Sequence, residues 1–211
     1  MKATITLIAA MLLLLTTGGG RALQAQTDVP PEGARYGVKS AIIEQRDLRI
    51  GNTRIITYID DYGAKESQEI VYEDGSAILD ILEIEKGTMV GIIHSKKRAE
   101  RFRRVKPNNY FRMAPEEMKR FQISDVPYVS GSINKRCKRY RLETMVDGID
   151  LTVTYITWEG IVLQKTLESK KEPEANTDTY AISIEVNVPI PPEKFEVPKG
   201  IKIEDKTSLA E

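Results

Sequence analysis

The chain has 211 residues, with 31 basic and 31 acidic side chains, 41% hydrophobic residues and 29% charged residues. This balance excludes wholesale disorder, which needs few apolar residues and a large net charge. A single cysteine excludes an internal disulfide framework, and a single histidine excludes a histidine-cluster metal site.

The first 25 residues have the features of an export signal. Lys2 precedes a largely apolar run over residues 5–15, and small residues at Ala22 and Ala25 suit cleavage by signal peptidase. The run is shorter than the roughly 20 residues that span a bilayer, which argues against a membrane anchor. We therefore expect residues 1–25 to be a Sec-type signal peptide, and the mature chain to be periplasmic or secreted with no transmembrane span. Its formal net charge is then −2, from 29 basic and 31 acidic residues.

The rest of the chain divides into three unequal parts. Residues 26–35 contain two prolines and no hydrophobic periodicity, so we expect a flexible leader. Residues 36–203 are expected to form one folded domain, and residues 204–211 a C-terminal tail. Within the domain, the polar stretch 168–179 predicts an exposed loop.

Hydrophobic residues in the domain alternate with a period of two, which is typical of half-buried strands. The clearest alternation runs from Ile182 to Val188. Strands are expected around residues 38–43, 55–59, 70–72, 77–84, 88–93, 136–142, 151–158, 161–163 and 182–188. Turn signals lie at residues 60–63, 73–75, 86–87 and 147–148, and the last two predict hairpins.

Helical signals are few. Residues 115–121 begin with Pro115, followed by two acidic and then two basic residues, an order that favours the start of a helix. Residues 99–105 are ambiguous between strand and helix. Hairpin connections are short, so antiparallel pairing is favoured. The sequence predicts a mainly β (α+β) fold, with a single curved antiparallel sheet and one or two short helices.

Candidate catalytic residues are equally few. His94 follows a predicted strand, where a surface histidine is the ordinary outcome. Cys137 has two basic residues on each side. An exposed thiol in that setting would be reactive, whereas a buried one would pack as a small hydrophobic group, and we favour burial. The chain contains no G-x-S-x-G, P-loop or Cys/His metal motif. We therefore expect a protein that is not an enzyme, with no catalytic site, metal or cofactor.

Charge is distributed unevenly along the chain. Residues 96–141 contain fifteen basic and four acidic residues, a local net charge of +11. Such a segment favours an anionic partner, unless its bases pair with acids on adjoining strands. We expect no nucleic acid, because the chain is exported and has no nucleic-acid-binding motif. The expected ligand contacts are Lys96, Arg101, Arg103 and Arg139 at an anionic head group.

Two aromatic residues are further candidates for a binding surface. Tyr155 and Trp158 lie three apart in a predicted strand, so we expect them to face opposite sides of the sheet. One of them should pack in the core, and the other should line a concave surface.

Five short motifs, taken together, resemble a known group of proteins. They are YGVKSAIIE at residues 36–44, YIDDYGAKE at 58–66, GSINKRCKRY at 131–140, WEGIVL at 158–163 and PEKFEVPKG at 192–200. In this order they resemble uncharacterised exported proteins of Gram-negative envelopes, which are distant relatives of the periplasmic lipoprotein carriers of the Lol system. The resemblance implies an open half-barrel over residues 36–203, a curved sheet wrapped around helices, with an apolar cavity for acyl chains and no catalytic site.

Two functions follow as expectations. The first is a non-enzymatic carrier or chaperone that binds a lipid or a lipidated protein on an apolar concave face, because each buried CH₂ contributes about 0.8 kcal/mol. The alternative is a secreted module that binds an envelope protein or polymer and has no ligand cavity.

Overall fold

The computed structural model describes residues 29–48, 53–104, 106–146, 148–169, 171–173 and 176–209. The expected signal peptide and residues 26–28 of the expected leader lie outside the described residues.

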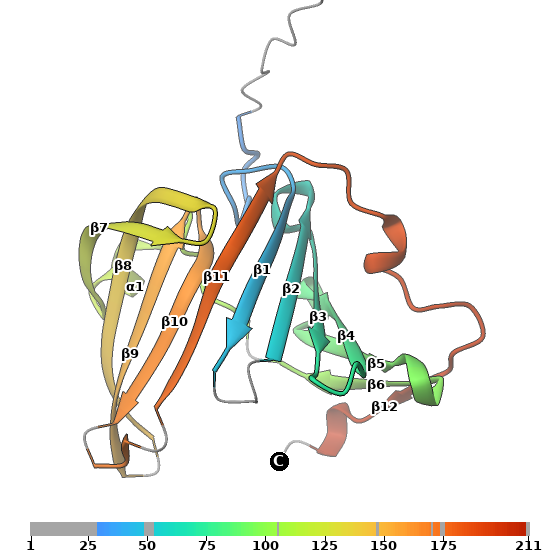
Figure 1. Cartoon of the computed structure of the whole chain (residues 1–211). Helices are drawn as coiled ribbons and strands as arrows, with labels where there is room; N and C mark the ends of the chain where they lie inside the picture. The colour runs from blue at the N-terminus through green and yellow to red at the C-terminus, as the bar shows by residue number, and fades with distance from the viewer. Residues whose placement is uncertain are drawn as a thin grey trace, which may run out of the picture.

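The described residues form one curved, open sheet of twelve strands (Figure 1). The strands are β1 (Ala41–Asp47), β2 (Thr53–Asp60), β3 (Lys65–Val71), β4 (Ala77–Glu83), β5 (Thr88–Ile93), β6 (Arg98–Arg103), β7 (Gln122–Ser130), β8 (Ile133–Val146), β9 (Ile149–Trp158), β10 (Ile161–Ser169), β11 (Thr177–Val186) and β12 (Ile203–Asp205). Their order is β12-β6-β5-β4-β3-β2-β1-β11-β10-β9-β8-β7, so β12 and β7 form the two edges. The predicted mainly β fold with a single curved sheet is confirmed. The sheet is mixed, because β12 pairs parallel to β6.

The predicted helix at residues 115–121 is confirmed only in its first turn. The helix α1 covers Pro115–Met118, and β7 begins at Gln122. Phe121 lies beyond the helix, and its ring packs edge-on against Tyr140, with the ring centroids 5.8 Å apart. Short 3-10 turns occur at η1 (Asp61–Gly63), η2 (Ile84–Lys86), η3 (His94–Lys96), η5 (Pro192–Lys194) and η6 (Thr207–Leu209).

Two other predictions need revision. The ambiguous residues 99–105 contribute to strand β6, which runs from Arg98 to Arg103. The expected loop at residues 168–179 is too long, because β10 extends to Ser169 and β11 begins at Thr177. Polar side chains extend this pairing, since Gln164 donates a hydrogen bond to Asp178 across the two strands at 3.1 Å.

The predicted hairpin turns are confirmed. β4 and β5 are joined through η2, where Gly87 has a φ of +63°. β8 ends at Val146 and β9 begins at Ile149, so the chain reverses at the predicted position.

The buried apolar residues form two clusters. The larger one gathers residues of the sheet's centre and of β7–β8: Tyr36, Val38, Ala41, Ile43, Ile59, Tyr128, Ile133, Cys137, Ile161, Leu163 and Ala181. The smaller one lies on β4, β5 and β6: Leu79, Ile81, Val90, Ile92 and Ala99. Residues 189–206, here called the C-terminal strap, cover the smaller cluster with Val197, Ile201 and Ile203. The strap leads from β11 around the sheet to its β6 edge (Figure 1).

Among the described residues, no helix combines the length and apolar character that crossing a bilayer would require.

Candidate functional site

A cavity of about 340 Å³ lies on the concave face of the sheet, and we call it the concave cavity. Its floor consists of alternate residues of three neighbouring strands, which point to one face of the sheet. These residues are Ile43 and Gln45 of β1, Ile55, Thr57 and Ile59 of β2, and Glu66 and Gln68 of β3. Pro107, Asn108 and Tyr110 add a further wall, from the segment that passes behind the sheet in Figure 1. The volume lies within the range of about 300–1,000 Å³ that is typical of ligand pockets.

One wall of the concave cavity contains a buried ion pair. Arg35 Nη1 donates a hydrogen bond to Glu66 Oε2 at 2.7 Å, and these side chains are 11% and 7% exposed. The Tyr36 hydroxyl donates to the same carboxylate oxygen at 2.7 Å. Burial, together with the charge of Glu66, raises the pKa of Tyr36 well above its ordinary value. Tyr36 therefore keeps its proton and remains a donor to Glu66.

A left-handed turn lies beside this ion pair. Asp61, Tyr62 and Gly63 have φ values of +50°, +54° and +91°. Non-glycine residues adopt this conformation at a cost of about 1–2 kcal/mol. The Arg35 N–H holds the turn by donating to the Tyr62 carbonyl at 3.0 Å. A Cβ atom at Gly63 would come within 2.6 Å of the Tyr36 ring, so this position requires glycine.

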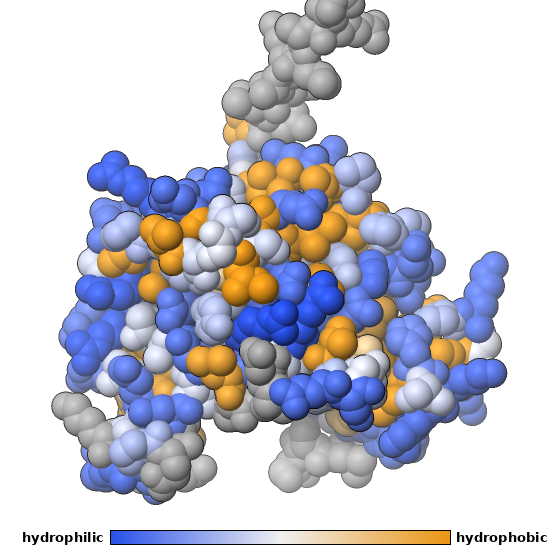
Figure 2. All heavy atoms as spheres, viewed as in Figure 1, coloured by the Kyte–Doolittle hydropathy of each residue, from blue (hydrophilic) through white to orange (hydrophobic). Residues whose placement is uncertain are grey.

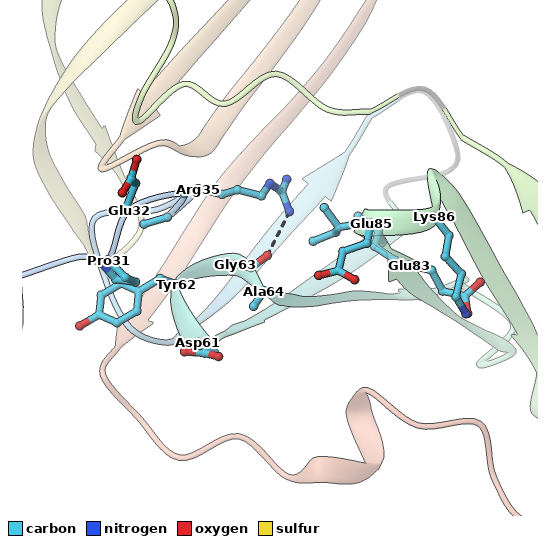
Figure 3. A pocket seen from close by; sticks show the side chains of 14 residues that line it. Pro31, Glu32, Arg35, Asp61, Tyr62, Gly63, Ala64, Glu83, Glu85 and Lys86 are labelled. Atoms are coloured by element: carbon cyan, nitrogen blue, oxygen red, sulfur yellow. Dashed lines mark hydrogen bonds and ion pairs between the residues drawn. The ribbon is translucent and has the colours of Figure 1, made fainter.

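A second cavity, of about 500 Å³, lies on the other side of Arg35 (Figure 3). Arg35 reaches toward Gly63 on one side of it, while Glu83, Glu85 and Lys86 stand on the opposite wall. Although burial opposes ionisation, hydrogen bonds from Arg101, Lys86 and Thr88 lower the pKa of Glu83 to about 2. We take the concave cavity as the candidate binding site, because its lining combines aliphatic, aromatic and polar side chains from several strands.

Aromatic rings close the concave cavity toward β8 and β9. The ring centroid of Tyr110 lies 5.2 Å from that of Tyr155 and 5.0 Å from that of Tyr140. Burial raises the pKa of Tyr110 well above its ordinary value. Tyr110 also lines a third cavity, of about 300 Å³, which Trp158 borders. The tyrosines thus separate the concave cavity from the third cavity.

The two predicted aromatic contacts occupy different places. Tyr155 lines the concave cavity. Trp158 packs against the larger apolar cluster, and Lys135 Nζ lies 4.4 Å from its ring centroid. Trp158 is half-buried, and contact of either ring with a ligand stays a prediction.

The structure does not bring the four predicted basic residues together. Lys96 and Arg103 are exposed at β6 and the turn before it. Arg101 is paired with Glu83 at 2.7 Å. Arg139 is exposed on β8, near the opposite end of the strand order. None of the four lines the concave cavity, so they do not form the single cationic rim that we expected around it. Figure 2 shows one face of the molecule, where hydrophilic and hydrophobic side chains are interspersed.

Neither Cys137 nor His94 lines the concave cavity, and Cys137 borders the third cavity. Cys137 is 4% exposed, as the favoured interpretation predicted, and burial raises the pKa of its thiol to about 11. His94 is exposed at the start of η3.

Sequence reasoning missed several residues of the cavity. Arg35 falls in the expected flexible leader, and its partner Glu66 lies 31 positions away. Arg104 and Tyr110 come from a stretch with no clear periodicity. Glu66 and Gln68 lie two positions apart in β3, so their side chains face the same side of the sheet. This spacing of polar residues is the signal that could have indicated a polar concave face.

No protein family and no curated protein matches the sequence. An uncharacterized conserved protein from Thermus thermophilus has a similar structure, with a TM-score of 0.52 and 6% identity over 80% of this chain and 91% of that one. This similarity shows a shared fold. A domain from Vibrio parahaemolyticus named for outer membrane lipoprotein sorting matches at a TM-score of 0.35 and 9% identity, over 75% of this chain and 89% of that one. The protein PNGF-II matches at a TM-score of 0.36 and 9% identity, over 81% of this chain and 31% of that one. Neither of these two values establishes a shared fold.

Proposed function

We propose that the chain is an exported, non-enzymatic binding protein of the cell envelope, a carrier or chaperone that holds a lipid or the acyl chain of a lipidated protein in the concave cavity. Residues 1–25 would direct export, and residues 36–203 would form the binding domain.

The observation that carries this proposal is the cavity itself. Ile43, Ile55 and Ile59 provide an aliphatic floor, and Tyr110 and Tyr155 provide an aromatic wall. Transfer of an acyl chain from water to such a surface contributes about 0.8 kcal/mol per buried CH₂. No specific sequence motif is needed for this kind of binding.

The concave face differs from the wholly apolar one that the resemblance implied. Glu66, Gln68, Gln45 and Arg35 line the same cavity. A bound molecule would therefore meet polar groups as well as aliphatic side chains, which favours an amphiphile over a pure hydrocarbon.

Native mass spectrometry tests the proposal. The mature chain, purified from its natural envelope, should carry extra mass that organic extraction removes and that fragmentation identifies as lipid. Thr57→Phe, which places a ring in the cavity floor, should lose this mass. Arg54→Phe, on the same strand but exposed, should retain it.

A clean apoprotein mass, with no uptake when acyl lipids are supplied, would contradict the proposal. That result would favour the alternative of an interaction module that binds a protein or an envelope polymer.

A further inference from the structure

We infer that the concave cavity selects amphiphiles with an anionic head group, a carboxylate or a phosphate, and that the Arg104 guanidinium binds this head group. The inference rests on the proposed function, since it concerns the ligand of the same cavity.

The charges in the cavity lining do not cancel. The basic residues of the lining are Arg35, Arg104 and Lys165, and its acidic residue is Glu66. Arg35 and Glu66 neutralise one another through their 2.7 Å contact. Two positive charges are left in the lining, one from Arg104 and one from the exposed Lys165.

Arg104 has unused capacity for hydrogen bonding. Its Nη1 donates to the Met89 thioether sulfur at 3.2 Å, and thioethers are weak acceptors. Within the described part of the chain, no carboxylate oxygen lies within 4.0 Å of the side-chain nitrogens of Arg104 or Lys165. A guanidinium has five N–H donors in a planar fork that matches carboxylate and phosphate oxygens. A half-buried guanidinium without a carboxylate partner therefore forms stronger hydrogen bonds with an anionic ligand than with a neutral one.

The backbone places Arg104 where it can meet a head group. Its N–H donates to the Gly87 carbonyl at 2.9 Å, which ties the end of β6 to the β4–β5 hairpin. Half-buried Asp80 on β4 is the nearby countercharge: burial raises its pKa, and the charge of Arg104 opposes that rise. Asp80 therefore competes with a ligand for the guanidinium without pairing directly with it.

Displacement of a neutral fluorescent probe, 1-N-phenylnaphthylamine, from the delipidated mature chain tests the inference. The competitors share one alkyl chain and differ in the head group: dodecanoate, dodecyl phosphate, dodecanol and dodecyltrimethylammonium. Dodecanoate or dodecyl phosphate should bind at least about tenfold more tightly than dodecanol, because a hydrogen bond to a charged group contributes about 1.5 kcal/mol or more. The preference between the two anions distinguishes a free fatty acid from a phosphate-bearing lipid head group.

Three variants assign the effect to Arg104. Arg104→Met should lower the ratio of dodecanoate affinity to dodecanol affinity by about tenfold. Arg103→Met, at the adjacent exposed position, should keep the preference. Asp80→Asn should strengthen binding of the anions, because it removes the competing carboxylate. If Arg104→Met does not fold, dodecanoate binding to the unaltered chain is measured at increasing salt concentration instead. Binding through the charge of the head group should weaken as the ionic strength rises, because salt screens charge–charge interactions.

The failures of the two proposals can be told apart. Equal binding of dodecanol and dodecanoate, without salt dependence, would overturn the anion preference and leave the acyl-binding function standing. Failure of the probe and of all four amphiphiles to bind would overturn both.

Discussion

Replacement of Arg35 by methionine keeps a side chain of similar length but removes the positive partner of the buried Glu66 carboxylate. The two side chains are 11% and 7% exposed, so solvent cannot take over the lost interaction. Removal of one member of a buried pair costs about 3–5 kcal/mol. The Tyr36 hydroxyl still donates to Glu66, so we expect the lower end, about 3 kcal/mol. In a chain of this size that corresponds to a fall in melting temperature of about 6–12 °C.

Urea unfolding of the mature chain, followed by circular dichroism, measures this cost. Adding Glu66→Gln to Arg35→Met should recover part of the lost stability, because the uncompensated charge disappears. Arg54→Met is the matched control: Arg54 and Glu44 are 2.8 Å apart, but their side chains are 44% and 24% exposed. The control should cost less than about 1 kcal/mol. If Arg35→Met costs no more than the control, the buried ion pair does not support the wall of the cavity.

Three further predictions concern other parts of the molecule. Burial alone would raise the pKa of Glu69, but hydrogen bonds from Lys194 and Tyr58 hold it below its ordinary value. The stability that Glu69 contributes is thus present above its unfolded pKa of about 4.3 and is lost as the pH falls through the lowered value. Lys194→Met should therefore reduce the fall in the urea midpoint between about pH 5 and pH 3, and an unchanged fall would contradict the role of this contact. The Cys137 thiol, with a pKa of about 11, should react with iodoacetamide at pH 8 over a hundredfold more slowly in the native chain than in urea; equal rates would show that it is accessible. Ending the chain after Pro191 should uncover the smaller apolar cluster and the β6 edge, so size-exclusion chromatography should detect oligomers, whereas a monomer would indicate that the C-terminal strap is dispensable.

The strands were predictable because their signal is local. In β11, Ile182, Ile184 and Val186 alternate with polar residues, and Ile184 and Val186 pack half-buried against the larger apolar cluster. The hairpin turn at Gly87 was predictable for the same reason, since a positive φ favours glycine over other residues. Strand and turn chemistry together were enough to predict a curved sheet.

The candidate site was much less predictable, because its contacts are not local. Tyr155 could be proposed from its spacing to Trp158, which is a property of one strand. The pairing of Arg35 with Glu66 depends on how a segment before the sheet folds back onto β3. The arrangement of the basic residues was mispredicted for a related reason. Arg101 and Arg139 belong to the same basic segment of the sequence, residues 96–141, but lie on strands near opposite ends of the sheet.

The buried ion pair also bears on what the cavity is for. An apolar pair of similar volume would often be as stabilising as Arg35 and Glu66, because the desolvation of two charges offsets most of their attraction. What an apolar pair could not do is hydrogen-bond the segment before β1 to both the turn and the strand within residues 62–66. Arg35 donates to Glu66 in β3 and to the Gly63 carbonyl in η1, and its backbone N–H fixes the left-handed turn at Tyr62. The ion pair thus fixes Arg35 and Glu66 in the lining of the concave cavity at some cost in stability, as expected where polar contacts maintain a set geometry rather than a tighter core.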